Sequence, residues 1–543
     1  MTPAARPRRP LARLAAAAAA AALLIAGCTG QDGAPDDGGG AGDDGAASSA
    51  PVSEDGLVLE ELGTSAAQDL PADPAADPAY AAYYAQDIDW GACEGVEAED
   101  LECGSVTVPL IWNDPEGGDI EIAVGRLAAS GEPIGSLVTN PGGPGGSGVN
   151  FLESLPFLLS NEMRGAYDVV GFDPRGVQRS AGVECLSDEE TDEYLAATAA
   201  PGTAEFAQLA EEWGARIAEA CQANSGEVLP YLDTYSAARD MDVLRAALGS
   251  EQLDYLGYSY GTYLGSSYAD LYPERVGRFV LDGAMDPSIT MNELSAGQAE
   301  GFERATEAFL ANCLEAVDGC PFKGSADEAG QQLRAFFAAV DAAPLDTGDP
   351  QRPLTGALAR SAVLTLMYED GLWQLGREAL GAAMSGDGEQ LLTISDLSSE
   401  RAEDGTYRTN AAYAIVAVNC LDHPGVADDQ WVEQEAQRLA EEFPTFGPTL
   451  GGDGCAHWPV PPLREPAPIA AEGAAPIVVI GTTGDPATPY RWSQSLAEQL
   501  ADSVLLTYEG HGHTAYGRSG GCIEEQVDAY YLEGTLPEDG LTC

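Results

Sequence analysis

The sequence predicts an α/β fold with a mainly parallel eight-stranded sheet and an inserted helical cap domain. Short apolar and β-branched runs alternate with helical patterns over most of the chain, and strands that alternate with helices pair in parallel. One long segment, residues 286–468, breaks this rhythm with helical patterns alone. The chain has 543 residues, and single cores stop growing at about 250 to 300 residues, so two structural units are expected.

The first 28 residues have the pattern of a lipoprotein export signal. Four arginines within the first 13 residues precede an apolar run, Leu14 to Gly27, which is too short to span a bilayer core of about 30 Å. The run ends at Cys28 in a pattern that resembles the bacterial lipobox, where cleavage before the cysteine frees its thiol for a diacylglyceryl group. We therefore expect residues 1–27 to be a signal peptide and Cys28 to anchor an exported protein to the outside of the cell membrane. A secretory signal with a chance cysteine is the alternative.

Residues 28–85 are expected to be an acidic tether without fixed structure. Residues 29–79 contain no basic residue and are rich in glycine, alanine, proline, serine and aspartate. Such a composition buries too little apolar surface to offset the chain entropy that is lost on folding. The tether would hold the body of the protein away from the membrane.

The overall charge argues against anionic partners. The chain has 88 acidic and 25 basic residues, which gives a formal net charge of −63. Nucleic acid and bare anionic lipid are poor partners for this chain, because like charges repel across the whole surface.

The cysteines indicate disulfides rather than a metal site. If Cys28 carries lipid, ten of the eleven cysteines remain, an even number in an exported chain. No CxxC occurs and the four histidines are not at ligand spacing with cysteines, so we expect no metal and no cofactor. Spacing alone does not fix the connectivity, but it suggests that neighbours pair, as Cys93 with Cys103, Cys185 with Cys221, Cys313 with Cys320, Cys420 with Cys455, and Cys522 with Cys543.

Eight apolar runs are candidate strands. Six lie in residues 86–285 and two in residues 469–543, so these segments are expected to form one core in two parts. Residues 286–468 separate the sixth run from the seventh and are expected to form the cap. The runs are Val106–Ile111, Ile120–Leu127, Ile134–Thr139, Tyr167–Phe172, Leu253–Gly257, Val276–Leu281, Ile477–Gly481 and Val504–Tyr508. The helical patterns of the cap include Gly301–Leu314, Ser325–Val340 and Gln430–Glu442.

Ser259 is the candidate nucleophile. It lies in a GxSxG pattern, Gly257 to Gly261, and a pattern this short also occurs by chance in a glycine-rich chain. Ser519 has the same pattern, but no apolar strand leads into it and no helical pattern follows. At Ser259 an apolar run enters and a helical pattern leaves, which is the strand, turn and helix of the nucleophile elbow in the α/β-hydrolase fold. A serine in a glycine-rich turn is the structural alternative.

A serine hydroxyl needs a histidine to take its proton and a carboxylate to fix the imidazole tautomer. In the α/β-hydrolase fold the chain order is serine, acid, histidine, with the acid after a late strand and the histidine after the last strand. Asp485 and His513 follow the seventh and eighth candidate strands, and we expect them to be the acid and the base. The alternatives are His511 as the base and Asp282 or Asp286 as the acid.

The oxyanion of the tetrahedral intermediate needs two backbone N–H donors. The residue after the nucleophile, Tyr260, is expected to supply one. The other is expected from the glycine-rich loop of residues 140–148, which follows a candidate strand, with Gly143 as the candidate and Gly142 as the alternative. Phosphate binding by this loop is less favoured, because no Walker lysine follows it.

Together these motifs resemble the tripeptidyl-aminopeptidase-like branch of the proline iminopeptidase family of α/β hydrolases, known from secreted enzymes of high-GC Gram-positive bacteria. The resemblance covers roughly Asp87 to Cys543. It rests on residues 140–148, residues 171–176 (GFDPRG), the elbow at Ser259, residues 484–489 (GDPATP), and residues 512–514 (GHT) with Cys522. It implies an exported serine aminopeptidase that releases short peptides, such as tripeptides, from free N-termini through an acyl-enzyme. A carboxylesterase with the same triad, or a solute-binding lipoprotein without catalysis, is the alternative.

Two further roles are expected near the site. Asp422, in a Cys-x-Asp arrangement that relatives resemble, is the candidate carboxylate for the α-ammonium of a peptide substrate; a solvated surface charge is the alternative. Asp173 and Arg175 are candidates for a buried pair that supports the site, or else turn residues.

Overall fold

The structure is a computed structural model, and it describes residues 70–543 except 94, 96–99, 317–318, 425–428 and 451–453. The expected signal peptide, the anchor at Cys28 and most of the expected tether lie outside the described residues. The last part of the expected tether differs from the expectation, because residues 70–85 form short helical turns. Tyr80 there is 3% exposed and its hydroxyl donates to the backbone oxygen of Trp112, so aromatic side chains hold this stretch on the core.

The core is one sheet of nine strands in the order β1-β2-β3-β5-β4-β6-β7-β8-β9. All eight expected strands are present. The ninth, β1, pairs with β2 and has only two residues, which is too short to give an apolar run in the sequence. Strands β5, β4, β6, β7, β8 and β9 are parallel neighbours, while β1, β2 and β3 are antiparallel. The bounds are β1 Gly91–Ala92, β2 Leu101–Pro109, β3 Asp119–Leu127, β4 Gly135–Asn140, β5 Tyr167–Phe172, β6 Leu253–Tyr258, β7 Val276–Asp282, β8 Ile477–Gly484 and β9 Ser503–His511.

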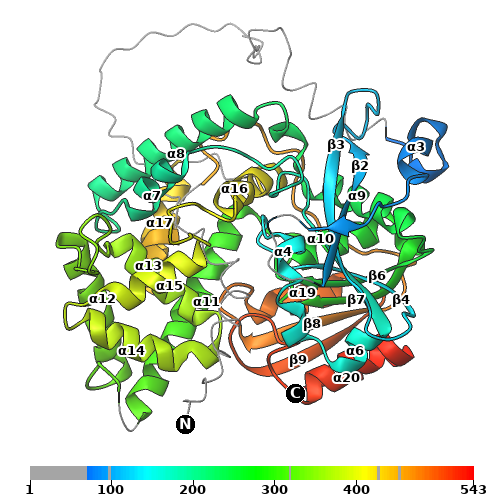
Figure 1. Cartoon of the computed structure of the whole chain (residues 1–543). Helices are drawn as coiled ribbons and strands as arrows, with labels where there is room; N and C mark the ends of the chain where they lie inside the picture. Colours follow the sequence, from blue (N-terminus) through cyan, green and yellow to red (C-terminus); the bar gives the residue numbers. More distant parts are fainter. Residues whose placement is uncertain (1–69, 94, 96–99, 317–318, 425–428, 451–453) are drawn as a thin grey trace, which may run out of the picture.

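Helices cover both faces of the sheet (Figure 1). Successive residues of a strand point to opposite faces, and in β8 Ile477 and Val479 pack with one hydrophobic cluster while Val478 and Ile480 pack with another. The first cluster contains α9 (Thr234–Ala247), α10 (Tyr260–Leu271) and α19 (Tyr490–Gln499). The second contains α5 (Leu155–Leu158), α6 (Asn161–Ala166) and α20 (Cys522–Glu533).

The cap lies between β7 and β8 in the chain and has its own core (Figure 1). Its helices are α11 (Met291–Glu315), α12 (Ala326–Ala342), α13 (Gly356–Met367), α14 (Trp373–Ala383), α15 (Glu389–Ser398), α16 (Ala411–Asp422), α17 (Asp429–Glu442) and α18 (Gly447–Leu450). Helix α16 packs instead against the core of the sheet domain. No helix in the described part of the chain is both long and apolar enough to cross a membrane.

Two helices from before β6 also approach the cap. They are α7 (Asp188–Ala196) and α8 (Ala204–Ser225), and α7 contacts α13. Two short helices lie near the start of the described chain: α3 (Ala81–Tyr84) follows the first helical turns, and α4 (Gly148–Phe151) follows the glycine-rich loop.

All five expected disulfides are present. They join Cys93 with Cys103, Cys185 with Cys221, Cys313 with Cys320, Cys420 with Cys455, and Cys522 with Cys543.

Candidate active site

Ser259 lies on a sharp turn between β6 and α10. Its backbone has φ 56° and ψ −125°, an unusual conformation for a residue with a side chain, and its N–H donates to the oxygen of Asp282 at 2.9 Å. The turn requires glycine on both sides. A Cβ on Gly257 would lie 2.4 Å from the oxygen of Gly261, and a Cβ on Gly261 would lie 2.8 Å from the oxygen of Asn140. The strand, sharp turn and helix that are expected of a nucleophile elbow are therefore present at Ser259.

His513 and Asp485 meet after the last two strands. Nδ1 of His513 lies 2.9 Å from each carboxylate oxygen of Asp485. Asp485 also accepts hydrogen bonds from the backbone N–H groups of Ala487, Thr488 and Thr514. The carboxylate is therefore fixed by three donors besides the imidazole. Nε2 of His513 is buried and has no hydrogen-bond partner among the described residues, which leaves it available to a substrate or a nucleophile.

The alternative base and acids lie elsewhere. His511 is exposed, and its ring lies against Trp373 rather than Asp485. Asp286 accepts hydrogen bonds from Ser288 and Gln499. Asp282 supports the site differently, because its carboxylate accepts the backbone N–H groups of two residues that follow His513, Ala515 and Tyr516. Burial raises the pKa of Asp282 to about 6.

The glycine-rich loop lies directly against the elbow. A Cβ on Gly142 would lie 2.8 Å from the Cβ of Ser259 and 3.0 Å from the nitrogen of Tyr260. The N–H of Gly142 donates to Oδ1 of Asn140 at 2.9 Å, so this group is already used. The next residue, Gly143, lines the same pocket as Ser259, so its N–H stays the candidate for the second oxyanion donor. Tyr260 is the first residue of α10, where backbone N–H groups have no partner inside the helix.

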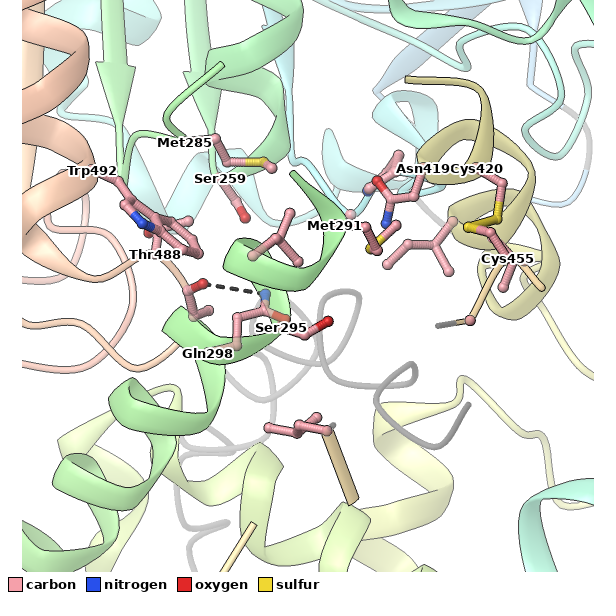
Figure 2. Close-up of a pocket in the computed structure, with 18 of the residues that line it drawn as sticks. Ser259, Met285, Met291, Ser295, Gln298, Asn419, Cys420, Cys455, Thr488 and Trp492 are labelled. Carbon is pink, nitrogen blue, oxygen red and sulfur yellow. Dashed lines mark hydrogen bonds between the residues drawn. A yellow bond between two sulfur atoms is a disulfide. The ribbon is translucent and has the colours of Figure 1, made fainter. Parts of the chain in front are cut away.

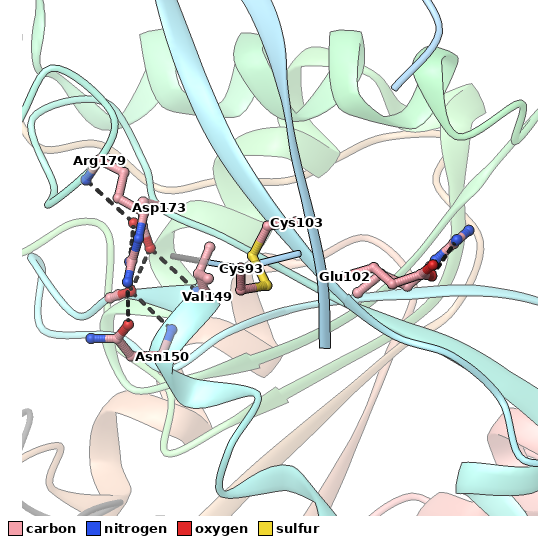
Figure 3. Close-up of a disulfide and its surroundings, with 9 residues drawn as sticks. Cys93, Glu102, Cys103, Val149, Asn150, Asp173 and Arg179 are labelled. Carbon is pink, nitrogen blue, oxygen red and sulfur yellow. Dashed lines mark hydrogen bonds and ion pairs between the residues drawn. A yellow bond between two sulfur atoms is a disulfide. The ribbon is translucent and has the colours of Figure 1, made fainter. Parts of the chain in front are cut away.

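Asp173 holds the far end of the same loop (Figure 3). Its Oδ1 accepts from the hydroxyl of Ser147 and the N–H of Val149, and its Oδ2 pairs with Arg179 at 3.0 Å. The expected pair of Asp173 with Arg175 does not form, because Arg175 turns into the core and binds Asp240 through two hydrogen bonds of 2.7 Å. Asp173 thus supports the site with a different arginine.

Comparison with known proteins gives the family. Residues 443–543 match the model of the TAP-like protein family. Over 480 residues the chain is 36% identical to the serine protease Hip1 of Mycobacterium tuberculosis, an alignment that covers 84% of this chain and 91% of the relative. The chain belongs to the TAP-like family of α/β hydrolases. This confirms the resemblance seen in the sequence, and the chain is a serine hydrolase.

Two further relatives have different names. The chain is 36% identical over 471 residues to carboxylesterase B of Mycobacterium tuberculosis, with 84% of this chain and 89% of the relative covered. It is 32% identical over 480 residues to the tripeptidyl aminopeptidase of Streptomyces coelicolor, with 84% and 86% covered. Relatives of similar identity thus carry a peptidase name and an esterase name.

A pocket opens beside Ser259 in this TAP-like hydrolase (Figure 2). Its volume is about 110 Å³, and the described residues that line it include no Asp, Glu, Lys or Arg. Ser259 and Trp492 lie on one side, and Asn419 and Cys420 of α16 lie on the other (Figure 2). The cap therefore supplies one wall of the pocket and the sheet domain supplies the other.

One polar group of the cap wall is oriented by the core. Nε2 of Gln298, on α11, donates to the backbone oxygen of Ala487 at 3.3 Å, which is the dashed line in Figure 2. Thr488, which also lines the pocket, places its hydroxyl 3.3 Å from Nδ1 of His513. Sequence reasoning did not single out either residue. The signal for Thr488 was its place three residues after Asp485 in the same turn.

The structure does not bring Asp422 into this pocket. Asp422 is 1% exposed, and its carboxylate accepts hydrogen bonds from the N–H and the hydroxyl of Thr234. Neither oxygen is directed at a substrate position beside Ser259. Its neighbours on α16, Asn419 and Cys420, line the pocket instead.

Proposed function

We propose that this TAP-like hydrolase is an exported serine peptidase that hydrolyses short peptides from their free N-termini. Ser259 is the nucleophile, His513 the general base and Asp485 the acid that orients it. The observation that carries this proposal is the pairing of His513 Nδ1 with both oxygens of Asp485 at 2.9 Å, beside Thr488, which lines the same pocket as Ser259. The peptide substrate is supported by the names of the relatives, a serine protease and a tripeptidyl aminopeptidase.

The mechanism follows from these groups. Nε2 of His513 takes the proton of the Ser259 hydroxyl as its oxygen attacks the scissile carbonyl, and Asp485 stabilises the imidazolium that forms. The N–H groups of Tyr260 and Gly143 receive the oxyanion. His513 then gives the proton to the leaving amine, which departs and leaves an acyl-enzyme on Ser259. Water next attacks the acyl-enzyme while His513 takes its proton, and His513 returns that proton to Ser259 as the peptide product leaves.

The ammonium contact that was expected of Asp422 is not part of this proposal, because its carboxylate is already filled by Thr234. We propose instead that neutral polar groups of the pocket bind the α-ammonium of the substrate. The carbonyl oxygen of the Gln298 side chain is a candidate, since the amide nitrogen is held by Ala487 and no described residue donates to the oxygen. A neutral acceptor would bind an ammonium more weakly than a carboxylate would.

A carboxylesterase is the second candidate function, and a specific observation favours it. The described lining of the pocket has no charged side chain, and an esterase has no need to recognise an ammonium. One relative is named carboxylesterase B. The third hypothesis, a solute-binding lipoprotein without catalysis, loses its support, because the chain belongs to a family of hydrolases.

Export and anchoring are proposed on the sequence alone. The signal pattern of residues 1–27 and the lipobox-like end at Cys28 support a lipoprotein on the outside of the cell membrane.

A series of tripeptide anilides with and without N-acetylation, beside p-nitrophenyl esters, tests the function. For a peptidase that acts at the N-terminus we expect kcat/KM to be at least tenfold higher for the free amine. Equal hydrolysis of the acetylated peptides would contradict action at the N-terminus, and hydrolysis of the esters alone would make the protein a carboxylesterase. Ser259→Ala, prepared in parallel, controls for contaminating hydrolases.

A further inference from the structure

A buried chain of hydrogen bonds joins the cap helix α16 to the nucleophile elbow. Asp422, the last residue of α16, accepts from the N–H of Thr234 at 3.1 and 3.2 Å and from the Thr234 hydroxyl at 2.5 Å. The same Thr234 hydroxyl oxygen is hydrogen-bonded to the phenol of Tyr260, the first residue of α10. These three residues are 1%, 0% and 3% exposed. Water therefore does not compete for these bonds.

The direction of this chain is set by Asp422. Burial raises the pKa of Asp422 to about 7, so the carboxylate is ionised above that pH, and in this form it only accepts hydrogen bonds. The Thr234 hydroxyl then donates its hydrogen bond to Asp422. Its oxygen is then left to accept from the phenol of Tyr260. A charged acceptor strengthens the bond that it receives and polarises the next bond in the chain. Burial raises the pKa of Tyr260 well above its ordinary value, which keeps the phenol a donor.

The carboxylate of Asp422 has no direct ion pair among the described residues, and besides the Thr234 hydroxyl it accepts the N–H of Thr234 at the start of α9. The nearby cation, Arg464, pairs with Asp233 at 3.3 Å and stacks over Tyr235 rather than pairing with Asp422. Burial and the charge of Asp233 raise the pKa of Asp422, while Arg464 and Thr234 oppose this shift. A buried carboxylate without a direct ion pair is costly, and such groups concentrate at functional sites. Here its bonds go to Thr234, and through it to Tyr260.

Tyr260 is in contact with its surroundings at both the phenol and the backbone nitrogen. The phenol is fixed through Thr234, and the backbone nitrogen faces Gly142 and Ser259. Its N–H is the oxyanion donor in the proposed function, and a displacement of about 1 Å at a catalytic group can cost about 100-fold in rate. A side chain tied at its far end limits such displacement.

We propose that Asp422 is a positioning residue, which through Thr234 holds Tyr260 and its oxyanion N–H in place and so couples the seating of cap helix α16 to the catalytic centre. This rests on the proposed function, in which Tyr260 is an oxyanion donor. Because α16 also lines the substrate pocket through Asn419 and Cys420, contact of a substrate with the cap wall is transmitted to the oxyanion site.

Three variants of the full chain remove one link each. Tyr260→Phe deletes the phenol and leaves the backbone N–H, Thr234→Val deletes the hydroxyl at nearly constant volume, and Asp422→Asn removes the charge. With a p-nitrophenyl ester we expect kcat to fall about 10- to 100-fold in each, less than the loss of a whole oxyanion donor, with KM changed less than twofold. The double variant Thr234→Val/Tyr260→Phe should be no slower than the slower single variant, because both break the same connection.

Tyr268→Phe is the matched control for a structural effect. Tyr268 lies in the same helix, is 0% exposed, and donates its phenol to Asp242 at 3.2 Å, away from Ser259. We expect Tyr268→Phe to lower the unfolding temperature while kcat stays at the wild-type value. Wild-type kcat in Tyr260→Phe, or an equal loss of kcat in Tyr268→Phe, would overturn the proposal.

The proposed function is checked separately, with a fluorophosphonate probe on the wild-type protein. If the probe does not label wild type, the proposed function fails. If it labels wild type and the three link variants turn over normally, only the positioning role fails.

Discussion

Replacing Asp485 with asparagine tests the proposed orientation of His513 with a change of one atom. Oδ1 of Asp485 accepts two backbone N–H groups, of Ala487 and Thr488, at 2.9 and 2.8 Å, so the carbonyl oxygen of the new amide will take this place. Its NH₂ group then takes the place of Oδ2 and faces Nδ1 of His513. Oδ1 also lies 2.9 Å from Nδ1, but it already accepts two backbone N–H groups. We therefore expect the imidazole to accept from the NH₂ group at Nδ1 and to carry its proton on Nε2, which is the tautomer that cannot take a proton from Ser259.

The magnitude follows from the same contacts. A wrong tautomer with intact geometry lowers kcat by about 10⁴-fold in serine hydrolases, which is about 5.5 kcal/mol. The N–H of Thr514, which donates to Oδ2 at 3.2 Å, loses its acceptor, so the free energy of unfolding should fall by about 1 to 3 kcal/mol. Steady-state hydrolysis of a p-nitrophenyl ester and urea unfolding measure the two effects. A kcat within tenfold of wild type would refute the role of Asp485, and Asp286→Asn should leave kcat unchanged.

Three other outcomes follow from the structure and the sequence. Gly142→Ala places a methyl group 2.8 Å from the Cβ of Ser259 and should lower kcat about 100- to 1,000-fold by displacing the oxyanion loop, whereas Gly249→Ala, with a similar positive φ but open space, should not. Cys28→Ser should move the protein from the membrane to the soluble fraction without a change in kcat, and retention after a salt wash would point to another anchor. Burial lowers the pKa of His423 to about 4, so between pH 6.5 and about 4 the unfolded chain binds a proton that the folded protein does not. As the pH is lowered from 6.5 to about 4, the free energy of unfolding should therefore fall by up to about 3 kcal/mol more in wild type than in His423→Gln. An equal fall in both proteins, measured by urea unfolding at each pH, would contradict this.

Much of the core could be predicted because its signals are local. A buried parallel strand is a continuous run of apolar residues, as in Ile477 to Gly481. At Ser259 such a run is followed directly by a helical pattern, which located the turn between β6 and α10. The two-residue strand β1 lacks any such run and was missed. Residues 70–85 were assigned to the tether by composition, although Tyr80, Tyr83 and Tyr84 could have indicated a contact with the core.

The choice between His511 and His513 needed information from distant residues. Both follow the last candidate strand, Val504–Tyr508, but β9 extends as far as His511, and Gly512 with φ 102° then redirects the chain. The N–H of His513 is held by the oxygen of Tyr368, which belongs to the cap segment. Neither contact is visible in the local sequence.

Asp422 shows the same limit more strongly. Its fate depends on Thr234, which lies 188 residues earlier in the chain. The Cys-x-Asp pattern located a buried and constrained carboxylate, but not the direction in which it points. Charge and spacing in the sequence could not distinguish an ammonium ligand from a support for Tyr260.

The identity of the nucleophile is tested most directly by labelling the protein with a fluorophosphonate and mapping the adduct by peptide mass spectrometry. We expect one adduct, on the peptide that carries Ser259, in wild type and in Ser519→Ala, and none in Ser259→Ala. Ser519 is half-buried, its hydroxyl donates to Glu524, and it serves as the control for the second GxSxG pattern. An adduct on any other serine, or labelling that persists in Ser259→Ala, would contradict catalysis by Ser259.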